Sequence, residues 1–599
     1  MPLPAPKTER IILHLDYDCF YASVIENQYP ELKGKPLGVQ QKQIIVTCNY
    51  EARRRGLRKL QLISEAKKTC PEVIIVLGED LTQFRDVSKE LYNLVRINYS
   101  WNGQVERLGL DEVFIDATDI VDYNLELLNE TNLQSSFFHL SKTDPTHGFS
   151  YDASTLSGES FPAKPASSTS YSQLADSNDK RLMLRLQLGS HLVQHIRQHL
   201  EQNGYTCTAG ISTSKLLSKL AGNIHKPRDQ TTLLPPYVAH DGSLSSVTQF
   251  MDPHEIGKVP GIGFKMAHKL REHVRQKNFD VIDWTIEASD QVLVRELRSM
   301  PGVNEATLER LLTGPGAPKG VGGLVWRLIH GVDESEVSQA RVVPTQISIE
   351  DSYRQLNTLE RAIEEMVKLS SSLIQRMRTD LLETMEEESG TAETTTSVSW
   401  LAKPKTLRLS TRPRAVIDGS RPKSFGRISR STGVPNFIFD ASESIDDLAD
   451  RLVGENILPM FRELHPQKKG WDLSLINVAV ANMQLGAGEG KAAAGRDISK
   501  MFKNQDAVLS AFRIDETLEA QEFPEDNNEL PNIPSLPHDG SEDAIPLSQS
   551  SEVFDDWNSD GDGSESESME RCLDCGSLMP AWVMDSHRRY HQEDGKSSQ

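Results

Sequence analysis

The chain has 599 residues, of which 37% are hydrophobic and 25% charged, and its net charge is −21. This length predicts about three to five domains. The sequence contains no apolar run of about 18 residues, so we expect no membrane span. The first seven residues, MPLPAPK, lack the apolar stretch of a secretory signal. Six cysteines are too few for a disulfide framework, which predicts a reducing compartment, cytosol or nucleus.

The negative charge is concentrated near the end of the chain. Residues 515–570 contain 18 acidic side chains and no Lys or Arg. The rest of the chain is therefore close to neutral, at about −3. An acidic, disordered linker of this kind does not exclude a nucleic-acid-binding body.

Residues 10–120 have the pattern of a compact α/β unit. Short apolar runs predict buried strands at 11–15, 44–46, 73–77 and 113–115, with helices at 64–70 and 82–98 between them. Strands that alternate with helices predict a mixed sheet covered by helices. Residues 124–178 are rich in Ser, Thr, Asp, Gly and Pro, which predicts a disordered insertion. A long helix is expected at 182–200.

The second half of the chain divides into three parts. Residues 237–335 are predicted to be helical, with glycine-rich turns at 260–263 and 301–303. Residues 341–485 are expected to form another α/β unit, with an alternating strand at 406–412 and a low-complexity loop at 386–397. The acidic segment then leads to a Cys/His cluster at 572–591.

Two carboxylate clusters lie at predicted strand ends. Asp16 and Asp18 follow the first strand, and Asp111 and Glu112 precede another. Mg²⁺ binds carboxylates together with substrate phosphates, and two such ions can clamp the oxygens of a phosphoryl transfer. Asp111 and Glu112 would reach one site only near a turn, which Gly109 allows. Solvated carboxylates at strand ends are the alternative.

Cationic groups and a glycine-rich turn offer contacts for phosphate. Arg53, one of three arginines after Tyr50, and Lys226 could bind phosphate oxygens, although a solvated basic helix is an alternative. The turn that contains Gly261 and Gly263 could present backbone N–H groups to DNA in the manner of a helix-hairpin-helix. An ordinary tight turn would look the same. Basic residues that follow this turn are Lys265 and Lys269.

Residues 403–430 form a basic stretch. They contain nine Lys or Arg against a single acid, Asp418. On a nearly neutral body this pattern predicts contact with a phosphate backbone, and a solvated basic loop is the alternative. The basic residues are Lys403, Lys405, Arg408, Arg412, Arg414, Arg421, Lys423, Arg427 and Arg430.

Taken together, these segments resemble the Y family of translesion DNA polymerases. The motifs that carry the resemblance, in family order, are 16–24 (DYDCFYASV), 49–53 (NYEAR), 106–112 (ERLGLDE), 209–212 (AGIS) through Lys215 to Lys226-Pro227, and 260–263 (PGIG). The likeness covers residues 9–485, about four-fifths of the chain. It implies a multidomain α+β fold with a right-hand arrangement. The implied parts are a palm at 1–19 and 81–236, fingers at 20–80, a helical thumb at 237–335 and an α/β little finger at 341–485.

The resemblance implies roles for individual residues. Asp16, Asp111 and Glu112 would be catalytic and bind two Mg²⁺ or Mn²⁺ ions, with the Tyr17 carbonyl as a further ligand. Tyr21 would be the steric gate against ribonucleotides. The dNTP triphosphate would be held by Tyr50, Arg53 and Lys226. DNA contacts would come from Gly261, Gly263, Lys265, Lys403, Lys405, Arg408 and Arg412.

Within the family, the chain resembles the polymerase iota branch. Residues 38–50, GVQQKQIIVTCNY, carry this likeness, with support from 78–82 and 106–109. It implies that Gln41, Lys42 and Ile44 lie against the templating base and narrow the pocket of the nascent pair. The chain departs from the family at Gly109-Leu110, where Ser-Ile is common, and at Arg228-Asp229, where Asn-Gly is common. The second departure puts an acid near Lys226.

The end of the chain has zinc-ligand spacing. Cys572, Cys575, His587 and His591 could close a tetrahedral Zn²⁺ site, and a metal would allow so polar a segment to fold. A single finger after an acidic segment is poorly suited to reading DNA. The segment resembles the ubiquitin-binding zinc finger of translesion polymerase eta, which implies ubiquitin as a partner. Arg589 stands where that finger type has an Asp, which places the ubiquitin contact in doubt.

A second partner segment is predicted just beyond the little finger, within 486–514. Ile498, Met501 and Phe502 match the hydrophobic part of a sliding-clamp-binding peptide, without its leading Gln. An amphipathic helical turn is the alternative.

The resemblance therefore implies a monomeric, nuclear DNA polymerase that uses primer-template DNA and dNTPs in error-prone translesion synthesis and DNA repair. A non-catalytic, polymerase-like adaptor recruited to a ubiquitinated clamp is the alternative, although a scaffold has no physical need for Asp16, Tyr21, Asp111 and Glu112 together. A nucleotide cyclase would explain the acids but not the thumb turn and the basic stretch.

Overall fold

The computed structural model describes residues 4–129, 131–163, 177–238, 243–277, 290–314, 319–341, 343–387, 395–414, 426–467 and 470–485, with two short strands at 569–571 and 578–580. These residues form two compact units. The first contains the described residues up to 341 together with 569–571 and 578–580, and the second contains those from 343 to 485. No helix in these ranges combines the length and apolar character that crossing a membrane requires.

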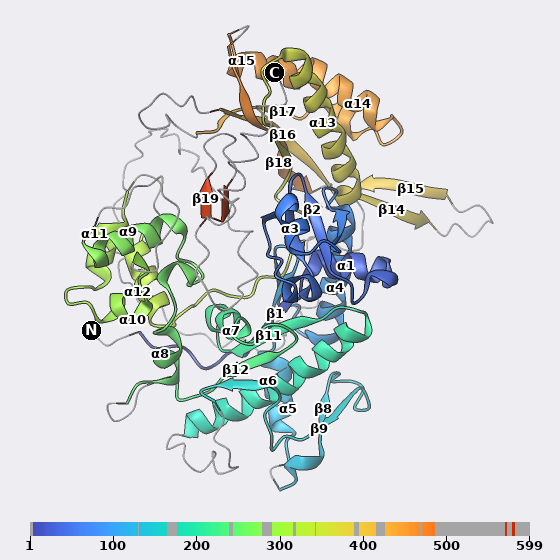
Figure 1. The fold of residues 1–599 in the computed structure, drawn as a ribbon. Helices are drawn as coiled ribbons and strands as arrows, with labels where there is room; N and C mark the ends of the chain where they lie inside the picture. The colour runs from blue at the N-terminus through green and yellow to red at the C-terminus, as the bar shows by residue number, and fades with distance from the viewer. Residues whose placement is uncertain are drawn as a thin grey trace, which may run out of the picture. The chain divides into compact units, whose positions relative to one another are not determined.

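A six-stranded mixed sheet is the centre of the first unit. In order across the sheet, its strands are Glu159–Phe161 (β10), Gln230–Leu233 (β12), Cys207–Ser212 (β11), Ile12–Tyr17 (β1), Glu112–Asp116 (β7) and Val105–Leu108 (β6). The helices around it are Thr82–Tyr99 (α4), Thr118–Glu126 (α5), Ser177–Gln202 (α6) and Lys215–Gly222 (α7) (Figure 1). All six residues of β1 are buried, as expected for a central strand.

Glycines allow α6 and α7 to approach opposite faces of this sheet. A Cβ on Gly189 of α6 would contact Ile211 at 3.4 Å, whereas a Cβ on Gly210 would collide with the Ser218 carbonyl of α7. Successive residues of a strand face opposite sides, and His14 is the register partner of Gly210. His14 and Asp16 therefore lie on the α7 face.

A smaller sheet and three helices follow β1 in the sequence. The strand order is Gln61–Leu62 (β4), Ile44–Cys48 (β3), Leu37–Gln41 (β2) and Ile74–Leu77 (β5), and the helices are Phe20–Gln28 (α1), Tyr50–Arg54 (α2) and Ile63–Thr69 (α3). The strands expected at 44–46 and 73–77 and the helix expected at 64–70 are confirmed to within two residues. The region expected to form the fingers thus has its own sheet.

The described residues between 237 and 335 fold into helices, as predicted. Its α-helices are Ser246–Met251 (α8), Phe264–Arg275 (α9), Val294–Ser299 (α10), Glu305–Leu312 (α11) and Val321–Ile329 (α12). Gly261 (φ 89°) and Gly302 (φ 83°) adopt the left-handed conformation in the two predicted turns, which glycine does without steric cost.

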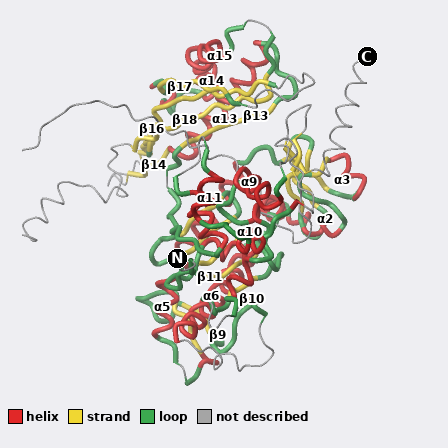
Figure 2. Tube along the Cα trace, turned by 90° about the vertical axis from the view of Figure 1, so that its left-hand side faces the viewer, coloured by secondary structure: helices red, strands yellow, loops and turns green. Residues whose placement is uncertain are grey.

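The second unit is a four-stranded antiparallel sheet covered by helices (Figure 2). The strand order is Gln346–Ser352 (β13), Leu473–Leu485 (β18), Ala402–Pro413 (β16) and Ile428–Gly433 (β17). Its helices are Leu359–Leu381 (α13), Ile445–Leu452 (α14) and Leu458–Leu464 (α15), and Leu382–Glu387 (β14) pairs with Thr395–Trp400 (β15).

The disordered insertion expected at 124–178 is wrong for most of its length. Residues 118–126 complete α5, Ser136–His139 (β8) and Gly148–Tyr151 (β9) form a hairpin, and β10 pairs with β12. Phe138 is fully buried, and Phe149 stacks on His195 of α6 at 4.1 Å between ring centroids. The average composition hid a few aromatic residues that join this segment to the core of the first unit.

Candidate active site

Asp16 and Glu112 are cross-strand partners in the central sheet. They occupy directly opposed register positions of β1 and β7, and each is 2% exposed. Gly109 (φ 66°) lies in the turn between β6 and β7. The Tyr17 amide donates to the Asp111 carbonyl at 2.8 Å. The predicted turn therefore brings the backbone of Asp111 beside the end of β1.

Two lysines neutralise the buried carboxylates. Lys226 Nζ lies 2.7 Å from Asp16 Oδ2, and Lys219 Nζ of α7 lies 2.6 Å from Glu112 Oε2. Buried carboxylates are tolerated when they are paired and hydrogen-bonded. The site therefore holds two carboxylates, each paired with the ammonium group of a lysine.

His14 adds a third group to Glu112. Its Nε2 lies 3.1 Å from the same Oε2 atom that Lys219 contacts. Burial lowers the pKa of His14, which favours a neutral imidazole whose Nε2–H donates to the carboxylate. Burial by itself would raise the pKa of Glu112, but the hydrogen bond from His14 and the positive charge of Lys219 hold this pKa below its usual value. Because His14 is neutral, Lys219 is the charge that keeps Glu112 ionised.

Asp18 faces a different environment from Asp16. Its carboxylate accepts hydrogen bonds from Thr208 Oγ1 at 3.2 Å and from the Arg228 amide at 3.1 Å. Burial raises the pKa of Asp18 despite these bonds. Arg228 adopts a left-handed φ of 55°, a conformation that residues other than glycine rarely adopt. The Asp229 carboxylate accepts from the Gln230 amide.

Tyr21 is held by an aromatic neighbour. Its ring stacks on Phe84 of α4 with centroids 4.3 Å apart, and Phe84 is fully buried. A ring packed in this way has a fixed position, which a steric gate requires.

Tyr50 and Arg53 lie on a capped helix turn. The Asn49 side chain accepts from the Ala52 amide and caps α2. The Arg53 guanidinium carbon lies 4.7 Å from the centre of the Tyr50 ring. Cap and stacking together fix the two groups predicted to bind triphosphate.

Gln41, Lys42 and Ile44 lie at the β2–β3 turn. Gln41 pairs with Ile44, and Lys42 occupies the turn with φ 51°. Gln41 Nε2 donates to the Gly78 carbonyl at 2.9 Å. The amide of Gln41 is therefore engaged by the protein itself.

The predicted DNA contacts differ in exposure. Lys265 is exposed at the start of α9, and Lys403, Lys405 and Arg408 are exposed on β16 of the second unit. Arg412 is half-buried and its Nε donates to Ser474 Oγ at 3.0 Å. A residue held in this way is less suited to a phosphate contact than the other three on β16.

Among the described residues, no three His, Cys, Asp or Glu side chains are arranged around a metal position. The donor chemistry nevertheless fits a divalent ion, because Asp16 and Glu112 supply carboxylate oxygens and already attract cations. The predicted zinc ligands Cys572, Cys575, His587 and His591 and the clamp-binding residues Ile498, Met501 and Phe502 lie outside the described residues.

His14, Lys219 and Phe84 were not predicted as parts of the site. Their contacts to Glu112 and Tyr21 join residues that are 63 or more positions apart, so no local spacing shows them. The one available signal was Lys219, a charged residue among the buried Leu216, Leu217, Leu220 and Ala221 of α7.

The sequence of the chain is similar to those of known proteins over the residues that form this site. Residues 15–223, which include Asp16, Asp111 and Glu112, match the model of the impB/mucB/samB family. The match runs from β1 to just beyond α7. The chain is 30% identical to human DNA polymerase iota over 484 residues, which is 80% of the chain and 53% of that protein.

Two further relatives are similar to shorter parts of the chain. DNA polymerase iota of Drosophila melanogaster is 38% identical over 266 residues, 44% of the chain and 31% of that protein. DNA polymerase eta of Arabidopsis thaliana is 27% identical over 405 residues, 64% of the chain and 52% of that protein. The chain thus spans about half the length, or less, of these relatives.

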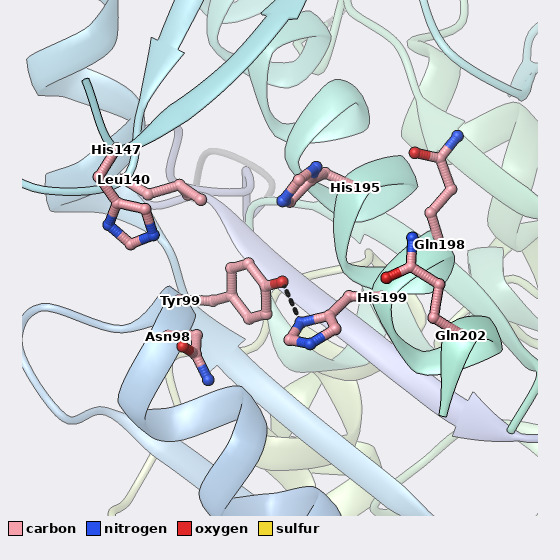
Figure 3. Close-up of a pocket in the computed structure, with 8 residues that line it drawn as sticks. All are labelled: Asn98, Tyr99, Leu140, His147, His195, Gln198, His199 and Gln202. Atoms are coloured by element: carbon pink, nitrogen blue, oxygen red, sulfur yellow. Dashed lines mark hydrogen bonds between the residues drawn. The ribbon is translucent and has the colours of Figure 1, made fainter. Parts of the chain in front are cut away.

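A cavity of about 240 Å³ lies beside α6, apart from the carboxylates (Figure 3). Tyr99 Oη lies 2.6 Å from His199 Nδ1, and His195 and His147 also line the cavity. Burial and the nearby His199 and His147 lower the pKa of His195. The neutral imidazole of His195 is consistent with its stacking on Phe149.

Proposed function

We propose that the chain is a DNA-directed DNA polymerase that extends a primer by error-prone, translesion synthesis. The opposed pair Asp16 and Glu112, within a segment that matches the impB/mucB/samB family model, is the observation that carries the proposal. The substrates would be primer-template DNA and a dNTP, and the work would take place in the nucleus.

Positioning and charge neutralisation would supply the catalysis. Asp16, Asp111, Glu112 and the Tyr17 carbonyl would hold two Mg²⁺ or Mn²⁺ ions. When bound, these ions would activate the primer 3′-OH and stabilise the leaving pyrophosphate. The remaining work falls to side chains that hold the substrate.

Lys226 would act on the triphosphate. It bonds Asp16 at 2.7 Å, and it would become available to the triphosphate when Asp16 binds a divalent ion instead. Tyr50 and Arg53 would bind the other phosphate oxygens, since guanidinium and phenol groups donate hydrogen bonds to phosphate. Tyr21, fixed by Phe84, would exclude the 2′-OH of a ribonucleotide.

Primer extension on undamaged and abasic templates, with Mg²⁺ and with Mn²⁺, tests this proposal. We expect extension by the wild type and none by the Asp111→Ala/Glu112→Ala variant. Glu90→Ala, which removes an exposed carboxylate on α4, is the matched control and should retain full activity. No extension by the wild type with either ion would favour the adaptor function instead.

We further propose that the end of the chain binds Zn²⁺ through Cys572, Cys575, His587 and His591. The strands β19 (Met569–Arg571) and β20 (Leu578–Pro580), which flank the two cysteines in the sequence, pair antiparallel. Metal analysis of the full chain should give one zinc per molecule. Cys572→Ser/Cys575→Ser should lose it, whereas Cys70→Ser should not.

Two protein partners complete the proposal. Ubiquitin would bind the zinc segment, and a sliding clamp would bind Ile498, Met501 and Phe502. Retention of the full chain on immobilised ubiquitin and on immobilised clamp tests each contact. Retention that survives Cys572→Ser/Cys575→Ser, or Met501→Ala/Phe502→Ala respectively, would refute it.

A further inference from the structure

The end of β5 is fastened to the β2–β3 turn by a set of hydrogen bonds. The Gly78 amide donates to the Gln40 carbonyl at 2.8 Å, and Gln41 Nε2 donates to the Gly78 carbonyl at 2.9 Å. The Lys42 amide donates to Glu79 Oε1 at 3.0 Å. We call this set the fingers latch. It consists of Gly78 and Glu79, the Gln41 side-chain amide bonded to Gly78, and the Lys42 backbone amide bonded to Glu79.

The latch depends on a close approach that only glycine allows. A Cβ on Gly78 would collide with Val39 Cγ1, and Val39 is fully buried in the core. The neighbouring β2 and β5 pair in parallel as far as Gln40 and Leu77. Gly78 therefore continues the pairing of β5 by one residue and brings Glu79 over the turn.

The turn needs an outside partner because its own backbone is unusual. Lys42 is a non-glycine residue with φ 51°, and its amide donates to the Glu79 carboxylate. A left-handed non-glycine residue is held only where its surroundings stabilise it. The Gln40 side chain adds a bond to the Lys42 carbonyl at 2.8 Å. Glu79 and Gln40 thus hold Lys42 from both sides.

We propose that Glu79 and Gly78 are positioning residues that set how the efficiency of nucleotide insertion by this polymerase differs between template bases. They would do so by fixing the edge formed by Gln41, Lys42 and Ile44. The inference rests on the proposed function and on the expectation from the sequence that this edge lies against the templating base. Gln41 acts through its bond to Gly78, not as a donor to the base. If this edge cannot move, the pocket for the nascent base pair stays narrow. A narrow pocket accepts the base pair formed by one template base better than the base pair formed by another.

The test measures kcat/KM for correct insertion opposite template A and opposite template T, and takes the ratio of the two. A variant that is merely less stable loses activity equally on both templates, so its ratio does not move. We expect Glu79→Ala to bring the ratio about tenfold closer to one, equivalent to about 1.4 kcal/mol. Glu79→Gln keeps an oxygen acceptor for the Lys42 amide and should stay within about twofold of the wild type.

A second variant keeps the proposal testable. Gln41→Met removes the donor to Gly78 and should shift the ratio in the same direction. The double variant Gln41→Met/Glu79→Ala should show less than the sum of the two effects, because both act on one latch. The control Glu90→Ala should leave the ratio unchanged.

The outcomes separate the two levels of inference. If the wild type extends primers but its A and T efficiencies are equal, or if Glu79→Ala leaves their ratio unchanged, the latch has no role in specificity. Equal shifts with Glu79→Ala and Glu79→Gln would also overturn the proposal. If the wild type does not extend primers at all, the proposed function itself fails.

Discussion

Replacing Phe138 by alanine tests whether residues 131–163 form a folded part of the first unit. Phe138 is fully buried, and its ring lies 5.1 Å from Phe149 and 6.0 Å from Tyr151. Removal of such a ring costs about 3–5 kcal/mol, because transfer, cavity and aromatic-pair contributions are all lost. Its neighbour Phe137 is 38% exposed, so Phe137→Ala should cost about 1–2 kcal/mol.

Hydrogen exchange measures this difference locally in the full-length protein. Phe138→Ala should speed exchange of the β8–β9 amides by about 100-fold relative to Phe137→Ala, since about 1.4 kcal/mol corresponds to a factor of ten. The α6 amides around His195 should exchange faster as well, because Phe149 stacks on that ring. Unprotected β8–β9 amides in the wild type, or equal effects of the two variants, would refute the reasoning.

Three further predictions concern other parts of the first unit. Arg185→Met should lower the free energy of unfolding by about 2–3 kcal/mol, because Arg185 bonds Asp122 and two backbone carbonyls. Urea titration measures this loss, with the exposed Arg181→Met as the control. Tyr21→Ala should raise kcat/KM for ribonucleotides relative to deoxyribonucleotides by about 10- to 200-fold in single-nucleotide insertion assays, and an unchanged ratio would contradict the gate. The pKa of His195 is lower in the folded chain than its usual 6.5, so the unfolded chain binds a proton at this residue first as the pH falls. The melting temperature should therefore decline from pH 7 to pH 5. His195→Gln should make this decline shallower.

Buried strands and their terminal acids could be predicted because their signals are local. The run that ends at Asp16 and the Gly109 turn before Glu112 each show in a few consecutive residues. Fully buried strands also read as continuous apolar runs, and β1 is buried throughout. The sequence did not show which strands pair, because the contacts of β1 with β7 and β11 join residues about 100 to 200 positions apart.

The ordered insertion shows the limit of composition as evidence. Phe138, Phe149 and Tyr151 are separated by many polar residues, so the average for the segment is that of a disordered chain. Their stabilisation comes from α6, which begins only at Ser177. The structure of a polar segment therefore depends on whether its few aromatic residues meet a surface supplied by another part of the chain.

The same dependence on distant residues explains how the candidate site is stable before substrate arrives. Asp16 and Glu112 are both buried, and two such charges would repel one another without partners. Lys226 and Lys219 each supply one positive charge within 2.7 Å, so the pair is neutralised by the chain itself. Lys226 is also the residue proposed to bind the triphosphate, which brings negative charge into the site. Divalent ions bound to the carboxylates would add positive charge and release Lys226 from Asp16. A triphosphate bound to Lys226 would add negative charge. The two charges would compensate, so the binding of either ligand would favour the binding of the other.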